Sequence, residues 1–205
     1  MRSRILAAAR NLITERGYDG VTMRDLADAS GVALKTLYYQ YTNKENLLRV
    51  AIEEKFFSAY EEIDTAKFDH GIDRLFYIIE TVGGTSARDE AYAKASAPLL
   101  VSRSTVSTLG RVRMNIYRRA IQEIADASDL VSWTDVTLLT ALIYRQISAV
   151  YLSWSYGQLP IGLVPDLSKL SASLSLATVT TGYSQERARA TAEELSVKHR
   201  GRIFY

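Results

Sequence analysis

The sequence contains no cysteine, which excludes disulfide bridges and zinc sites built from thiolates. Histidine is nearly absent as well, because His70 and His199 are the only two and neither has the spacing of a metal-ligand pair. We therefore expect no metal site. The lack of thiols by itself leaves the redox compartment open and is compatible with a reducing cytoplasm.

Motifs for nucleotide binding and nucleophilic catalysis are also missing. The chain contains no phosphate-cradling loop and no nucleophile elbow. We interpret Gly83-Gly84 as the end of a helix, and the adjacent carboxylates of Glu61 and Glu62 lie at different azimuths of a helix, which indicates solvation. These absences predict a protein that is not an enzyme and uses no cofactor.

The chain has no long uninterrupted apolar run and no strong charge of one sign. Its longest apolar segment, residues 134–154, contains Arg145 and Gln146, and no signal sequence precedes the first predicted helix. The net charge is +2; residues 1–50 carry eight basic and five acidic side chains, and the remainder carries 17 and 18. We expect a soluble cytoplasmic protein with no membrane partner, and the charge permits nucleic-acid binding without predicting it.

The sequence does contain a helix-turn-helix pattern between residues 21 and 48. Thr22 and Asp25 have the spacing of a capping box at the start of one helix, and Gly31 supplies the backbone freedom that a sharp turn requires. A second helix is predicted over residues 33–40. Such a pair is typical of DNA-binding proteins. A solvated helix pair within an all-helical bundle has the same pattern and is the alternative.

A further predicted helix, residues 3–16, precedes this pair and ends at Gly17, which completes a three-helix unit. The unit closely resembles the signature of the TetR family of bacterial regulators. The matching residues are Ala8-Ala9-Arg10, Leu12, Gly17-Tyr18-Asp19, Thr22, Leu26-Ala27, Gly31-Val32, Thr36-Leu37-Tyr38-Tyr39, Lys44-Glu45 and Leu47-Leu48. The resemblance covers about the first fifty residues.

The resemblance implies that the second helix of the pair lies in the major groove of double-stranded DNA. The residues implied to contact DNA are Thr22 and Lys44 at phosphates, Tyr38 and Tyr39 at backbone and bases, Leu34, Lys35 and Thr36 at base edges, and Ala33 at the start of the helix. Lys35 is the best candidate for specificity because its ammonium can donate to guanine O6 and N7. Ala33 departs from the family, in which many members carry a capping Ser, and a missing cap costs roughly 1 kcal/mol.

The remaining chain is predicted to be helical, which makes the fold all-α. The expected helices span residues 44–63, 71–83, 87–100, 105–128, 134–156 and 166–181, with one more amphipathic helix over 183–195. We expect two domains: residues 1–45 form the helix-turn-helix domain, and residues 46–205 form a larger helical bundle for ligand binding and dimerisation.

The family resemblance implies a homodimer that binds a palindromic operator, most often as a repressor, and releases it when a small molecule binds in the larger domain. An aromatic or apolar effector would suit the side chains that are candidates for its pocket, although ordinary core packing explains each of them singly. They are Tyr60, Phe76, Tyr77, Tyr92, Arg113, Tyr117, Tyr144, Arg145, Tyr151 and Trp154.

Of the two arginines in this set, Arg145 is the stronger candidate for a specific polar contact, because it interrupts an apolar helix. An arginine inside such a helix must find an acceptor in its own chain, in a partner subunit or on an anionic ligand.

A different class of function also remains open: the protein could be an architectural or protein-recruiting DNA-binding dimer without a small-molecule sensor. A sensor has an enclosed cavity and couples ligand binding to DNA binding. An architectural protein has no such cavity and no such coupling.

Overall fold

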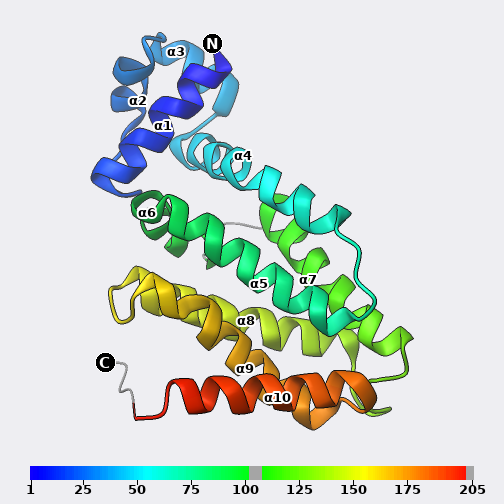
Figure 1. Ribbon diagram of the computed structural model, residues 1–205. Helices are drawn as coiled ribbons and strands as arrows, with labels where there is room; N and C mark the ends of the chain where they lie inside the picture. The colour runs from blue at the N-terminus through cyan, green and yellow to red at the C-terminus, as the bar shows by residue number, and fades with distance from the viewer. Residues whose placement is uncertain (102–107, 202–205) are drawn as a thin grey trace.

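The computed structural model describes residues 1–101 and 108–201, and within them the protein is helical, with a single isolated β-bridge between Leu130 and Thr180. The predicted all-α class is confirmed. The helices are α1 (Arg2–Arg16), α2 (Met23–Ser30), α3 (Leu34–Tyr41), α4 (Lys44–Thr65), α5 (Gly71–Arg88), α6 (Glu90–Val101), α7 (Thr108–Asp126), α8 (Val136–Ser155), the 3-10 helix η1 (Ile161–Leu163), α9 (Val164–Val179) and α10 (Gly182–Lys198) (Figure 1).

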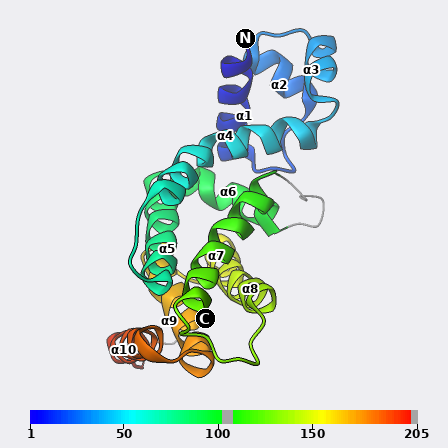
Figure 2. The ribbon, with the colours of Figure 1, turned by 90° about the vertical axis from the view of Figure 1, so that its right-hand side faces the viewer.

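The three N-terminal helices form one end of an elongated molecule, and α10 lies at the opposite end (Figures 1 and 2). Helix α4 leaves the N-terminal unit and runs along the larger bundle, where it packs against α5 and α7. It is therefore the main covalent and packed connection between the two parts. The predicted boundary after residue 45 falls in the first turn of this helix.

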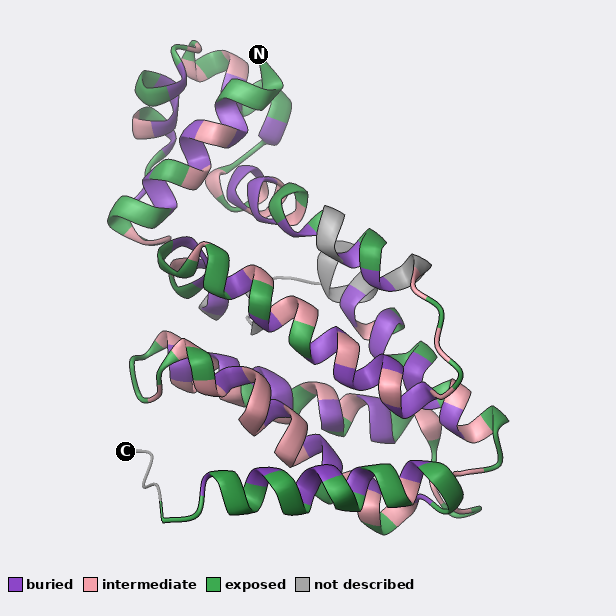
Figure 3. Cartoon of the chain, viewed as in Figure 1, coloured by how far each residue is buried: buried purple, intermediate pink, exposed green. Residues whose placement is uncertain are grey.

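The N-terminal unit folds because each of its helices buries one apolar stripe. On α1 the buried residues recur at three and four positions, the period of a helix, while the opposite face stays exposed (Figure 3). The residues of this common core are Ile5, Leu6, Ala9, Leu12 and Ile13 of α1, Leu26 of α2, Leu37 of α3 and Leu47 and Leu48 of α4. The first turns of α4 thus complete the core of the N-terminal unit.

The predicted helix end at Gly83-Gly84 is wrong, because α5 continues through both glycines to Arg88. The structure explains why Gly83 is there: a Cβ atom at this position would lie 2.7 Å from the Cγ of Pro165 in α9. Its missing side chain lets two helices approach closely, which is a packing role rather than a helix stop.

Several helix boundaries also differ from prediction. Helix α6 begins at Glu90 rather than at residue 87, because the longer α5 ends at Arg88 and Asp89 separates the two helices. Helix α9 begins at Val164, with Pro165 in its first turn. The missing N–H of proline breaks no helical hydrogen bond at this position. Helix α10 extends the predicted segment 183–195 to Lys198. The predicted start of α7 at residue 105 lies outside the described residues.

Helix α8 is the most apolar of the long helices, and it is the described helix that by length and composition alone would suit a membrane span. It packs against α6, α7 and α9. Only 33% of its most apolar window is buried within one chain, and Leu138 and Leu142 stand exposed on it. One side of α8 is therefore covered by the bundle while another apolar side is open.

Candidate nucleic-acid interface and small-molecule cavity

Helix α2 begins and ends with the features that the sequence predicts. The Thr22 hydroxyl accepts a hydrogen bond from the Asp25 backbone N–H at 3.2 Å, and the Asp25 carboxylate accepts one from the Thr22 backbone N–H at 2.9 Å. Hydrogen bonds from Thr22 lower the pKa of the Asp25 carboxyl. Gly31 has φ 62° and ends α2 in the left-handed region. The predicted capping box is confirmed.

Helix α3 turns one side into the core and the other to solvent. Leu37 and Tyr41 are buried, whereas Lys35 is exposed and the Tyr38 and Tyr39 side chains are 49% and 90% exposed. The remaining predicted contacts of this helix, Leu34 and Thr36, are half-buried at its edges. A short helix that presents a cation and two aromatic hydroxyls on its outer face has the width and chemistry to enter a DNA major groove.

The start of α3 lacks a side-chain cap. Ala33 occupies the N-cap position with φ −57° and ψ 136°, and no side-chain hydrogen bond closes the first turn. The backbone geometry is nevertheless that of a capping residue, so a hydroxyl at this position would be correctly placed. This agrees with the departure from the family that the sequence indicates.

The connection from α3 to α4 is unusually tight. Thr42 adopts φ 66° and ψ −50°, and the Asn43 backbone N–H donates to the Tyr41 carbonyl at 2.7 Å, which makes a γ-turn. Left-handed φ is rare for a β-branched residue and stores strain. Asn43 then caps α4 by accepting from the Asn46 backbone N–H at 2.8 Å. The angle between the outward helix and the connecting helix is therefore set by a stiff corner.

Lys44 does not project freely from the start of α4. Its ammonium donates to the Tyr18 carbonyl at 3.3 Å and lies 4.9 Å from the centre of the Tyr18 ring. This contact fastens the first turn of α4 to the loop after α1. A phosphate contact from Lys44 requires either that this ammonium leave the carbonyl or that its remaining protons be shared.

A small cavity lies inside the larger bundle, where α4, α5, α6, α7 and α8 meet. Four of the predicted pocket residues line it: Tyr60, Arg113, Tyr151 and Trp154. Residues that sequence reasoning missed complete the lining, and they are Phe56, Val82, Ser86, Ala93, Ala97 and Ser148. Most are small or plainly apolar, so nothing distinguishes them from core residues in the sequence. The cavity measures about 20 Å³, enough for roughly one water molecule.

Arg113 is the one charged residue in this lining, and it is only 5% exposed. Its guanidinium lies 5.1 Å from the centre of the Tyr144 ring, and the ring of Tyr117 packs edge-on against Tyr144 at 5.8 Å. Tyr92 lies on the far side of Phe56, stacked at 6.4 Å. These contacts bring seven of the ten predicted pocket residues into or beside one aromatic cluster.

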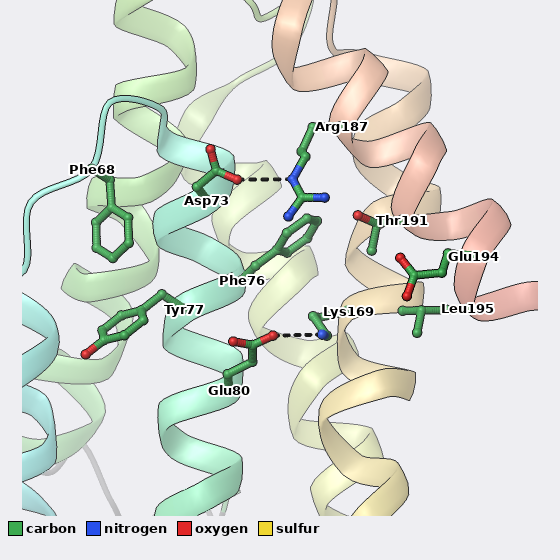
Figure 4. A pocket seen from close by; sticks show the side chains of 10 residues that line it. All are labelled: Phe68, Asp73, Phe76, Tyr77, Glu80, Lys169, Arg187, Thr191, Glu194 and Leu195. Carbon is green, nitrogen blue, oxygen red and sulfur yellow. Dashed lines mark hydrogen bonds and ion pairs between the residues drawn. The ribbon is translucent and has the colours of Figure 1, made fainter. Parts of the chain in front are cut away.

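The other three lie elsewhere. Arg145 is exposed on α8 in the single chain, so its predicted pairing with an acceptor in its own chain or in a partner subunit stays a prediction. Phe76 and Tyr77 border a separate groove of about 280 Å³ between α5, α9 and α10 (Figure 4). Four of its five charged residues form two ion pairs, with Arg187 on Asp73 at 3.1 Å and Lys169 on Glu80 at 2.8 Å. Helical periodicity places these residues on a side of a helix but does not tell which neighbour covers that side.

Comparison with known proteins agrees with the N-terminal geometry. The family model "Bacterial regulatory proteins, tetR family" matches residues 5–51. The regulator IcaR of the icaADBC biofilm operon of Staphylococcus epidermidis is 38% identical over 56 residues, which is 27% of this chain and 30% of IcaR. The repressor KstR of Rhodococcus jostii is 27% identical over 161 residues, 74% of this chain and 69% of KstR. The chain thus spans less than a third of IcaR.

Solved structures extend the likeness to the whole fold. The regulator FadR of Bacillus subtilis, in complex with stearoyl-CoA, superimposes with a TM-score of 0.70 at 22% identity over 83% of this chain and 97% of FadR. The repressor SmeT of the Stenotrophomonas maltophilia efflux pump SmeDEF has a TM-score of 0.72 at 18% identity, covering 90% of this chain and 92% of SmeT. At these sequence identities the similarity establishes a common fold only.

Proposed function

We propose that this chain, whose residues 5–51 match the TetR family of bacterial regulatory proteins, is a cytoplasmic transcriptional repressor of that family. It would bind a palindromic operator as a homodimer and release it when a small molecule binds. The observation that carries this proposal is the exposed face of α3. Lys35, Tyr38 and Tyr39 project from a helix whose opposite side is locked into the N-terminal core. Lys35 can donate to guanine, and the two tyrosines can reach the DNA backbone.

The open apolar side of α8 is the surface where the second copy docks. Leu138, Leu142 and Gln146 follow one another at intervals of four residues and so form one stripe along α8. The Gln146 amide donates to the Ser175 hydroxyl of α9 at 2.8 Å. This hydrogen bond places the stripe beside α9, where Leu174 is also exposed. A two-fold axis over α8 and α9 would present two copies of α3 to DNA, and their spacing should match one helical turn of DNA, about 34–36 Å, or a larger interval.

Ligand binding reaches the DNA through α4. This helix begins beside α3 at Lys44 and carries Phe56 and Tyr60 into the lining of the cavity. The cavity is nearly closed, so an effector larger than a water molecule has to push α4 away from α7 and α8. A shift of α4 moves the stiff corner at Thr42 and changes the separation of the two α3 helices in the dimer.

This cavity favours the sensor over an architectural DNA-binding dimer. An architectural protein needs only a packed bundle to dimerise, whereas this bundle keeps an arginine inside an apolar cavity. FadR, which shares the fold, was solved with an acyl-CoA. Acyl-CoA compounds and their carboxylic acids are accordingly the first effector classes to screen.

The proposal is tested by incubating the purified protein with random DNA duplexes, sequencing the bound fraction, and repeating the selection at two salt concentrations. We expect an enriched palindrome whose affinity falls as salt rises, because phosphate contacts release counterions. A folded dimer that enriches no sequence contradicts the proposed operator binding. The enriched duplex then serves as the reporter for effector release.

A further inference from the structure

We propose that the cavity between α4, α5, α6, α7 and α8 is a seat for a carboxylate, with Arg113 as its counter-ion and an apolar body of the ligand lying against Phe56, Val82 and Trp154. The inference rests on the proposed function and names the chemical class of the effector. Its starting point is a guanidinium that stays charged at every physiological pH and is almost completely withdrawn from water.

No partner within the described part of the chain neutralises this charge. None of the described carboxylates pairs with Arg113, and its Nη1 atom has no hydrogen-bond partner there. The groups around it are tyrosines, and burial raises the pKa of Tyr60, Tyr117 and Tyr151. Their hydroxyls are therefore neutral at pH 7. The Tyr144 ring offers only a cation–π contact.

An uncompensated buried charge is costly, so a fold that keeps one without a structural partner is poised for an external one. The cavity also supplies one donor for an oxyanion: the Tyr151 hydroxyl lies beside Ser86 and donates no hydrogen bond within the described residues. The Ser86 and Ser148 hydroxyls, by contrast, already donate to the Val82 and Tyr144 carbonyls. A single guanidinium in an apolar site matches one negative charge. This favours a monoanion such as a carboxylate over a phosphate, which carries more charge at pH 7.

The rest of the lining selects the body of the ligand. Phe56, Val82, Ala93, Ala97 and Trp154 are apolar or aromatic. They would contact a hydrocarbon chain or a flat ring once α4 moves away from α7 and α8 and enlarges the cavity of about 20 Å³. The matched test pair is therefore decanoate and decan-1-ol, which share a chain length and differ in charge. Both are used below the concentration at which they aggregate.

The chain provides its own fluorescent reporter. It has two tryptophans: Trp154 lines the cavity, and Trp133 is exposed on the surface. In a Trp133→Phe background, tryptophan emission reports the cavity alone. We expect decanoate to shift this emission with at least tenfold higher affinity than decan-1-ol, since hydrogen bonds between charged groups are the strong ones.

Substitution of the arginine separates the charge from the packing. Arg113→Met should reduce the affinity ratio of decanoate to decan-1-ol to about one, and Arg113→Lys, which keeps the charge, should retain part of the preference. Arg118→Met is the matched control, because Arg118 lies on the same helix but is exposed; its ratio should equal that of the parent.

Thermal unfolding of the ligand-free protein gives a second measurement that needs no ligand and no DNA. Arg113→Met should raise Tm by about 3 °C or more, because a buried charge is replaced by an apolar side chain of similar length. A lower Tm would show that Arg113 is a structural residue and would overturn the inference. Equal affinity for decanoate and decan-1-ol, or no binding of decanoate, would overturn it too.

The outcome for this site is distinguishable from that for the proposed function. If decanoate binds through Arg113 but leaves operator binding unchanged, the carboxylate seat stands and the sensor role fails. If operator binding is sequence-specific but decanoate does not bind, the repressor stands and the carboxylate seat is wrong.

Discussion

The N-terminal unit and the larger bundle differ in how completely their buried polar side chains are hydrogen-bonded. In the N-terminal unit the buried Ser30 hydroxyl donates to the Leu26 carbonyl, and the helix starts at Thr22 and Asn43 are capped. Among the described residues, buried side-chain atoms without a hydrogen-bond partner occur only from residue 92 onward. They include Tyr92 Oη, Arg113 Nη1, Thr134 Oγ1, Tyr151 Oη, Ser168 Oγ and Ser173 Oγ.

This difference indicates which part of the molecule satisfies its buried polar groups without a ligand or a second subunit. A fully satisfied core specifies one rigid arrangement, and a rigid α3 is what sequence recognition requires. Unsatisfied buried groups cost stability unless something outside the chain completes them. We therefore expect the stability and shape of the larger bundle to depend on a ligand or a second subunit, and substitutions in the two parts should differ in what they change.

The largest expected effect comes from the open face of α8. Leu142, 46% exposed in the single chain, becomes buried in the proposed dimer, so Leu142→Glu should yield monomers. A monomer holds one half-site only, and we expect operator affinity to fall at least about a hundredfold. Sedimentation and a DNA-binding titration measure the two effects.

Val197→Glu is the matched control for this substitution. Val197 is 57% exposed on α10, outside the proposed interface, and a glutamate there should leave both the dimer and operator binding intact. If Leu142→Glu also remains dimeric, the second copy docks on another surface.

A substitution on α3 should separate DNA binding from everything in the larger bundle. Tyr38→Ala is expected to weaken operator binding by about tenfold or more, corresponding to roughly 1.4 kcal/mol, because it removes a group that we propose contacts the DNA backbone. Dimerisation and the Trp154 emission should not change. Tyr38→Phe separates the contribution of the hydroxyl to operator affinity from that of the ring. Unchanged operator affinity in Tyr38→Ala would refute the assigned contact.

Lys35 tests specificity rather than affinity. If its ammonium donates to guanine, Lys35→Ala should relax the preference at one base pair of each half-site, by about 1–3 kcal/mol. Repeating the duplex selection with the variant measures this directly. A uniform loss of affinity for all sequences would show that Lys35 contacts phosphate instead.

Smaller gains are expected where the N-terminal unit is not ideal. Ala33→Ser supplies the missing cap of α3 and should stabilise the protein by about 1 kcal/mol. Denaturant unfolding measures the change. A loss of stability would mean that the extended backbone at Ala33 does not present the hydroxyl to the first turn.

Thr42 gives the smallest expected change. Thr42→Gly relieves a left-handed backbone and should raise stability by at most about 1 kcal/mol, since the greater freedom of glycine in the unfolded chain opposes the gain. A looser corner between α3 and α4 should at the same time weaken the response of operator binding to an effector. Stability that falls without any change in response would argue against stored strain at this turn.

The N-terminal unit was largely predictable because its signals are local. The capping box of Thr22 and Asp25, the turn at Gly31 and the apolar stripe of α1 involve residues within a few positions of one another, and propensity and periodicity record such interactions directly. The family signature lies in the same fifty residues. The helical class and the approximate helices of the larger part followed from the same periodicity.

Only the tertiary structure decided the rest. Gly83 looks like a helix end until Pro165 of α9 is seen packed against it, and only the fold shows that Arg145 stands exposed on α8 in the single chain. The sequence likewise ranked Arg145 above Arg113, whereas packing of five helices buries Arg113 beside a cavity. Periodicity determines that a helix has an apolar side, but which neighbour covers that side, and whether it leaves a space, depends on contacts between residues far apart in the chain.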